Sequence, residues 1–113
     1  METSTEQEVL LVRLKGELDL AAADRVRGEL DQRMVLNNTR HLLLDLSRVT
    51  FIDSSGIGVI LGRYRKLAGS GGRLGILRPQ PQVKRILDIA GVSSLVPFYR
   101  SEKEGLSKLQ GKG

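Results

Sequence analysis

Short apolar runs alternate with segments of helical spacing along this chain, and this alternation constrains its fold more than any other feature. The apolar runs cover residues 9–14, 41–46 and 73–77. Runs of this length and composition are typical of strands that are buried in a sheet. Between them, residues 21–36 and 55–67 carry apolar side chains every three or four positions, as helices packed on a sheet do. This order predicts an α/β fold in which helices cover a mainly parallel sheet.

Capping and turn-forming residues indicate where the helices begin and end. Asp19 is a suitable N-cap for the helix at residues 21–36. Pro81 is typical of the first turn of a helix, and Gly91 is typical of the position after the last turn. These two residues predict a further helix between them.

The remaining segments are shorter or more polar. Residues 47–52 are interpreted as a connector, and Pro97 marks residues 95–99 as an edge strand. Residues 1–8 form a polar N-terminal segment. Residues 101–113 predict a short C-terminal helix that frays, followed by a tail.

The composition indicates one compact domain and excludes several kinds of site. The chain has 113 residues, of which 40% are hydrophobic and 27% are charged, and this suits one modest core. No apolar run approaches the roughly 20 residues of a membrane-spanning helix, so we expect a soluble, cytoplasmic protein without a membrane partner. With no cysteine and a single histidine, His41, a disulfide framework and a Cys/His zinc site are excluded, and no cofactor is expected.

Positive charge is unevenly spread along the chain. The net charge is +5, yet no acidic residue lies between Asp53 and Asp88. A positive face could attract nucleic acid, a nucleotide phosphate or an acidic protein surface. Because only 4% of the residues are aromatic, little is available for base stacking, and direct nucleic-acid binding is not expected. A nucleotide- or nucleic-acid-binding module at residues 63–85 remains an alternative. Its basic residues are Arg63, Arg65, Lys66, Arg73, Arg78, Lys84 and Arg85.

The stretch FIDSSGIGVILG, at residues 51–62, places an acid and two serines at the start of a predicted helix. A serine hydrolase needs its serine on a sharp G-x-S-x-G turn and a histidine as the base. Neither Ser54 nor Ser55 has the first glycine of that turn, and His41 has no sequence reason to lie nearby. A G-x-x-x-x-G-K-[ST] phosphate loop is also missing. The sequence therefore argues against an enzyme.

Two further interpretations of these serines stay open. One is an ordinary helix N-cap, which contributes about 1 kcal/mol. The other is a phosphorylation switch, because a hydroxyl at a helix start lies close to unpaired N–H groups and to the positive end of the helix dipole. A phosphate there would add roughly −1.5 to −2 charges beside Asp53, which a binding partner would feel strongly. Taken alone, the serine pair favours the cap.

The helix after the serines contains glycines that need an explanation. Gly58 and Gly62 are four residues apart, so they share one face of the helix, and each costs about 1 kcal/mol relative to alanine. A face without side chains lets another surface approach closely. Arg65 and Lys66 continue the outer side of this helix. The face either docks a partner or packs against a neighbouring element of the same chain.

Three motifs carry a resemblance to a known family. They are LKGELD at residues 14–19, FIDSSGIGVILGRYR at 51–65 and VKRILDIAGV at 83–92. Through them the chain resembles the anti-sigma-factor antagonists of bacterial sporulation and stress signalling, which are members of the STAS domain family. The sporulation type is the most similar. The resemblance extends from Val9 to Phe98.

The resemblance implies a non-enzymatic switch. In that family, the unphosphorylated antagonist binds an anti-sigma factor that is also a serine kinase, and the sigma factor is thereby released. Phosphorylation by the kinase ends the interaction, and a serine phosphatase restores it. The family's phosphorylated serine directly follows the aspartate of the motif. In this sequence that residue is Ser54, with Ser55 as its neighbour.

The resemblance also implies a fold and a docking surface. We expect a single STAS-like α/β domain over residues 1–113, with a mixed four- or five-stranded sheet and helices packed on one side. Eight polar residues precede Val9, fewer than family members often use for an added first strand. We expect a monomer, and a scaffold subunit of a stress-signalling complex is a further alternative. The predicted partner-binding residues are Glu17, Asp19, Asp53, Ser54, Ser55, Gly56, Gly58, Val59, Gly62, Arg65 and Lys66.

Overall fold

The computed structural model describes residues 1–111, so the predicted tail at residues 112–113 lies outside the described chain. Within residues 1–111, five strands form one mixed sheet in the order β1-β2-β3-β4-β5. The strands are β1 (Glu2–Glu6), β2 (Val9–Leu18), β3 (His41–Ile52), β4 (Leu74–Leu77) and β5 (Phe98–Tyr99). β1 runs antiparallel to β2, and the other neighbouring strands are parallel. The mixed sheet is therefore confirmed, with five strands.

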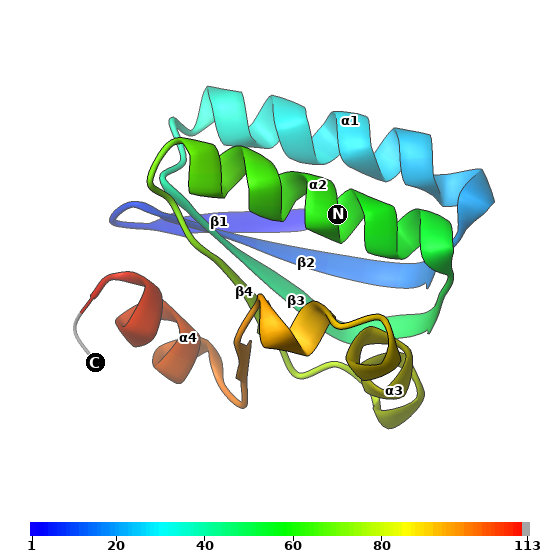
Figure 1. Cartoon of the computed structure of the whole chain (residues 1–113). Helices are drawn as coiled ribbons and strands as arrows, with labels where there is room; N and C mark the ends of the chain where they lie inside the picture. Colours follow the sequence, from blue (N-terminus) through cyan, green and yellow to red (C-terminus); the bar gives the residue numbers. More distant parts are fainter. Residues whose placement is uncertain (112–113) are drawn as a thin grey trace.

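Helices connect the parallel strands in sequence order. The described chain contains α1 (Leu20–Leu36), α2 (Ser54–Gly69), α3 (Pro81–Ile89), the 3-10 turn η1 (Val92–Ser94) and α4 (Glu102–Leu109). The connection between two parallel strands of one sheet is right-handed. Because β2, β3, β4 and β5 follow one another both along the chain and across the sheet, their connections lie on one face. Figure 1 shows α1 and α2 side by side over that face.

Alternating side chains build a core on each face of the sheet. Leu10, Leu42 and Leu44 belong to the larger core under α1, α2 and α3. The opposite face carries a smaller core that includes Leu43 and, from α4, Leu109. Such alternation between the two faces is inherent in a strand.

The prediction that the helices pack on one side is wrong for α4. Gly105 allows this helix to lie against the opposite face, since a Cβ at that position would be 2.9 Å from Leu43 Cδ2. The last residue of α4, Leu109, is 1% exposed. The end of the helix is therefore packed into the smaller core, and its fraying stays a prediction.

The prediction of a connector at residues 47–52 is wrong as well. β3 continues to Ile52 because its parallel pairing with β2 resumes after two register shifts and ends at the pair Leu18 and Ile52. Bulges of this kind let a strand bend without ending the ladder. The strand consequently runs straight into Asp53 and α2, and the end of β2 lies beside it.

The polar N-terminal segment also forms a strand. All five residues of β1 are exposed, and they pair with residues 9–13 of β2 as an antiparallel edge. The other edge of the sheet is β5, at the position that Pro97 indicated. Among residues 1–111, no helix is both long and apolar enough to cross a bilayer.

His41 is a polar residue at the start of β3, the central strand of the sheet. Its side chain is 6% exposed, and Nδ1 accepts a hydrogen bond from the Arg73 N–H at 3.0 Å. Burial, together with the positive charges of Arg73 and Arg40, lowers the pKa of His41 below its ordinary value of 6.5. The folded protein therefore prefers the neutral imidazole.

We predict that acid weakens the fold through His41. Below pH 6.5, the ordinary pKa, the unfolded chain binds a proton at His41 that the folded chain does not. The free energy of unfolding should therefore fall with decreasing pH, by at most about 1.4 kcal/mol per pH unit from this group. Urea unfolding at pH 7.5 and 5.5 measures the loss, and His41→Asn, which keeps an acceptor, should reduce it. Equal losses in the two proteins would contradict the role of His41.

Candidate functional site

Asp53 caps the helix that begins with the two serines. Its Oδ1 accepts hydrogen bonds from the Ser55 N–H at 2.9 Å and from the Gly56 N–H at 3.2 Å. Its backbone is extended, as is usual for an N-cap residue. The serine N-cap that the sequence left open is therefore not what caps α2.

The same carboxylate joins the starts of two helices. Asp53 Oδ2 accepts a hydrogen bond from the Leu20 N–H at 3.1 Å, at the first residue of α1. Asp19 caps α1 itself, with Oδ1 accepting from the Ala22 N–H at 3.1 Å. The positive ends of both helices thus meet two carboxylates at one end of the sheet.

Gly56 lets α2 start directly against β2. A Cβ on Gly56 would lie 2.2 Å from the Leu18 carbonyl oxygen and 2.8 Å from an Ile52 side-chain carbon. The Asp53 N–H donates to the same Leu18 oxygen at 3.4 Å. Gly56 is therefore buried in the contact between α2 and the end of β2. The prediction that it lies on the partner-binding surface is corrected accordingly.

Ser54 is the first residue of α2 and is exposed. Within residues 1–111, neither the Ser54 hydroxyl nor that of Ser55 takes part in a hydrogen bond. Ser55 is only partly exposed. Because Asp53 does the capping, the Ser54 hydroxyl is free to react with something outside the protein.

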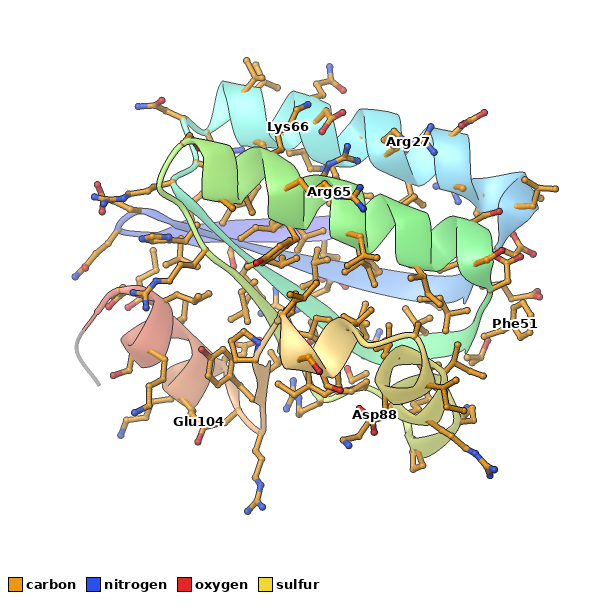
Figure 2. The ribbon with its side chains drawn as sticks, in the orientation of Figure 1. Arg27, Phe51, Arg65, Lys66, Asp88 and Glu104 are labelled. Carbon is orange, nitrogen blue, oxygen red and sulfur yellow. The ribbon has the colours of Figure 1, made fainter. Side chains whose placement is uncertain are left out.

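The outward side of α2 carries four of the predicted docking residues. At Gly58 and at Gly62 a Cβ would meet nothing within 4 Å, so these glycines face open space. Arg65 and Lys66 are exposed further along the helix, and Figure 2 shows them on its outer side. Val59 is different, because it is 1% exposed and belongs to the core under the helices. The prediction of Val59 as a partner-binding residue is therefore wrong.

Exposed apolar side chains lie close to the serines in the chain and were not predicted from the sequence. Leu20 is 76% exposed and Phe51 is 48% exposed. The Leu20 N–H donates a hydrogen bond to Asp53, and Phe51 pairs with Glu17 across β2 and β3. Figure 2 shows Phe51 beside the chain that leads into α2. Large exposed apolar side chains near polar groups are typical of protein-binding surfaces. The sequence signal was the FI pair before Asp53, which the connector interpretation concealed.

The basic stretch at residues 63–85 does not form one positive face. Arg63 is 6% exposed, and its Nε lies 3.2 Å from Asp31 Oδ1 on α1. Arg73 donates to the Leu109 carbonyl on the other side of the sheet, and Arg78 pairs with Asp45. These bases are directed to separate parts of the fold, which weakens the nucleic-acid alternative. Within residues 1–111, no group of three or more His, Asp and Glu side chains is placed to hold a metal ion.

The sequence of the chain matches a known family. The STAS domain description matches residues 1–105. The chain belongs to the STAS domain family. This STAS domain is 40% identical over 102 residues to the anti-sigma F factor antagonist of Paenibacillus polymyxa. The aligned residues make up 90% of this chain and 87% of the relative.

Two solved structures of one relative share the fold of this STAS domain. The anti-sigma factor antagonist SpoIIAA in its unphosphorylated form is 27% identical, with a TM-score of 0.83, covering 97% of this chain and 96% of that chain. The Bacillus cell fate determinant SpoIIAA in its phosphorylated form is also 27% identical, with a TM-score of 0.73, covering 95% of this chain and 96% of that chain. Both forms are therefore similar to this domain in fold.

We predict opposite effects of alanine at two glycines of α2. Gly56→Ala should lower the free energy of unfolding by about 1–3 kcal/mol, because its Cβ would collide with the Leu18 carbonyl oxygen. Gly58→Ala is the matched control and should raise it by up to about 1 kcal/mol, because alanine favours the helix and meets open space. Urea unfolding of the three proteins measures both. Similar values for the two variants would show that α2 does not depend on the close approach at Gly56.

Proposed function

We propose that this protein is an anti-sigma factor antagonist that is switched by phosphorylation of Ser54. Its unphosphorylated form binds an anti-sigma factor that is also a serine kinase, and the sigma factor is released. Phosphorylation by that kinase ends the binding, and a serine phosphatase restores it. The observation that carries this proposal is an exposed, unbonded Ser54 hydroxyl at the start of a helix that Asp53 already caps. The antagonist named among the relatives supports the same role.

In the proposed phosphoryl transfer, Ser54 is the one residue of this chain that takes part in the chemistry. The Ser54 Oγ attacks the γ-phosphorus of ATP held by the kinase, and the bond between that phosphorus and the β–γ bridging oxygen breaks. ADP leaves, and the hydroxyl proton passes to a base of the kinase. The acceptor needs only an accessible oxygen on a rigid element, which the first residue of a capped helix supplies.

The phosphate would act through its charge and would leave the helix start intact. Asp53 already accepts from the N–H groups of Ser55 and Gly56, so these donors are not available to a phosphate on Ser54. The added charge of roughly −1.5 to −2 would stand beside a carboxylate and point outward. A partner surface suited to the uncharged serine would then meet a like-charge and desolvation penalty. This favours electrostatic exclusion over a change of fold.

The surface around Ser54 has the layout of a docking site. Gly58 and Gly62 keep the outer side of α2 flat, and Arg65 stands at its far end without a partner among the described residues. Leu20 and Phe51 add exposed apolar area near Ser54. An apolar and flat centre with charged groups around it is the usual anatomy of a protein interface.

The first prediction of this proposal concerns the acceptor atom. Incubation with the cognate anti-sigma kinase and ATP should add one phosphate, and peptide mass spectrometry should place it on Ser54. Ser54→Ala should abolish the modification, whereas Ser55→Ala should keep it, because the Ser55 hydroxyl is less exposed. Phosphate on Ser55 in the unaltered protein, or none at either serine, would sink the proposal.

The second prediction concerns exclusion by charge. Ser54→Asp should weaken binding to the anti-sigma factor by at least about tenfold, because it places a second carboxylate beside Asp53. The asparagine of Ser54→Asn is nearly the same size as aspartate but uncharged. This variant should bind the anti-sigma factor with an affinity within a few-fold of that of the unaltered protein. Titration calorimetry of the three proteins measures the difference. An equal loss in both variants would show that size at this position, and not charge, decides binding.

A further inference from the structure

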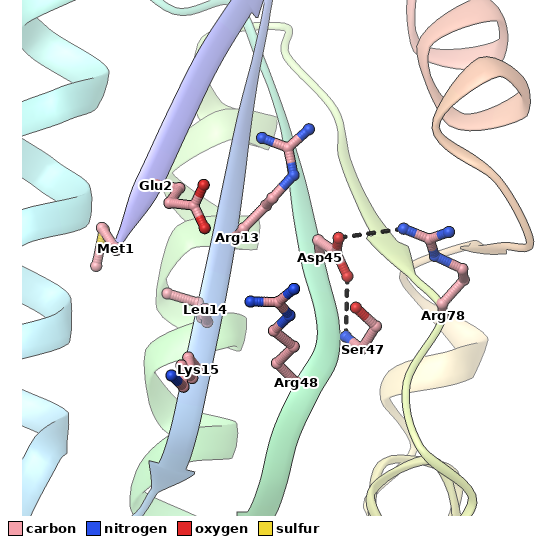
Figure 3. A pocket seen from close by; sticks show the side chains of 9 residues that line it. All are labelled: Met1, Glu2, Arg13, Leu14, Lys15, Asp45, Ser47, Arg48 and Arg78. Atoms are coloured by element: carbon pink, nitrogen blue, oxygen red, sulfur yellow. Dashed lines mark hydrogen bonds and ion pairs between the residues drawn. The ribbon is translucent and has the colours of Figure 1, made fainter.

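The face of the sheet opposite α1 and α2 is only partly covered. α4 packs on β3, β4 and β5, and the adjoining surface of β1, β2 and β3 stays open. A hollow of about 340 Å³ lies there, and Figure 3 shows the side chains that line it. They include Arg13, Lys15, Asp45, Ser47, Arg48 and Arg78, which come from β2, β3 and the segment after β4. The docking surface around Ser54 does not contribute to this hollow.

Positive charge exceeds negative charge in the hollow. Among the described residues that line it, four are basic and two, Glu2 and Asp45, are acidic. Arg13 is paired with Glu102 of α4 at 2.6 Å, and Arg78 Nη2 lies 3.3 Å from Asp45 Oδ2. Lys15 and Arg48 have no ion-pair partner within residues 1–111, and both are exposed. Lys15 and Arg48 thus stand without an ion pair beside two arginines that carboxylates hold in place, and Glu2 is the lining acid without an ion pair among the described residues.

A bulge in β3 brings these groups together. Arg13 of β2 pairs with Asp45 of β3, and Lys15 pairs with Arg48. The two pairs are thus two residues apart in β2 but three residues apart in β3. The extra residue shifts the alternation, so that Asp45, Ser47 and Arg48 all line the same hollow. Asp45 holds the bulge, since its Oδ1 accepts from the Ser47 N–H at 2.9 Å while it is 4% exposed. In a strand without a bulge, Asp45 and Arg48 would point to opposite faces of the sheet, because they are three residues apart.

We propose that this hollow binds a phosphate group carrying two or more negative charges, free or as part of a small molecule. Lys15 and Arg48, which form no ion pair among the described residues, attract such a group together with Arg13 and Arg78, and guanidinium groups bind its oxygens in pairs. No aromatic side chain lines the hollow among the described residues, so no ring there stacks on a nucleobase. Recognition rests on the phosphate. The site is separate from the proposed function, because it uses neither Ser54 nor α2.

Titration with inorganic pyrophosphate tests the site. Calorimetry at low salt should give saturable one-to-one binding with a dissociation constant below about 1 mM. Amide NMR shifts should concentrate at residues 13–15 and 45–48 and leave 54–66 unchanged. Lys15→Glu and Arg48→Glu should each weaken binding at least about tenfold. Arg85→Glu makes the same charge change on α3, away from the hollow, and should leave binding within about twofold.

Three results would overturn the proposal. One is absence of saturable binding by the correctly folded protein, whose folding is checked by thermal unfolding. Another is an equal loss in Arg48→Glu and Arg85→Glu, which would show diffuse attraction to net charge. The last is binding of ADP more than about tenfold tighter than pyrophosphate, which would show that a nucleobase is recognised. Equal affinity for ADP and pyrophosphate would support recognition of the phosphate alone.

Discussion

The contact between the end of β2 and the start of α2 determines the arrangement of the site. The Leu18 carbonyl oxygen occupies the space that a side chain at Gly56 would need, so α2 begins directly against the sheet. Asp53 then spans the two helix starts, because one oxygen accepts from α2 and the other accepts from the Leu20 N–H. The first turns of α1 and α2 are thereby held together, and Ser54 stands at their exposed edge.

Under the proposed switch, capping by Asp53 would separate the stability of α2 from signalling at Ser54. If the Ser54 hydroxyl were the cap, its phosphorylation would remove a hydrogen bond worth about 1 kcal/mol and disturb the helix start. With Asp53 as the cap, the hydroxyl makes no hydrogen bond among the described residues, and a phosphate on it would leave the hydrogen bonds of the helix start unchanged. The similarity of this fold to both the unphosphorylated and the phosphorylated forms of SpoIIAA agrees with such a separation.

The sequence predicted the elements whose pattern is local, and it missed those that depend on distant neighbours. The buried strands, α1 and its Asp19 cap followed from periodicity and capping chemistry. The extension of β3 to Ile52 did not, because a bulge breaks the alternation that identifies a strand. The side on which α4 packs depends on the space that Gly105 leaves for Leu43, which no local pattern shows. Asp53 and Ser54 are both good capping residues, so only the hydrogen bonds in the structure distinguish them.

The glycines of α2 have different roles that local spacing does not distinguish. By spacing, Gly56, Gly58 and Gly62 are alike, and any of them could serve packing inside the protein. In the structure Gly56 serves packing, whereas a Cβ at Gly58 or Gly62 would meet nothing within 4 Å. Each of these two costs about 1 kcal/mol relative to alanine, and no neighbour within residues 1–111 explains that cost. A partner that lies close against the helix beside Ser54, as proposed above, would account for both positions, because a close approach leaves no room for side chains there.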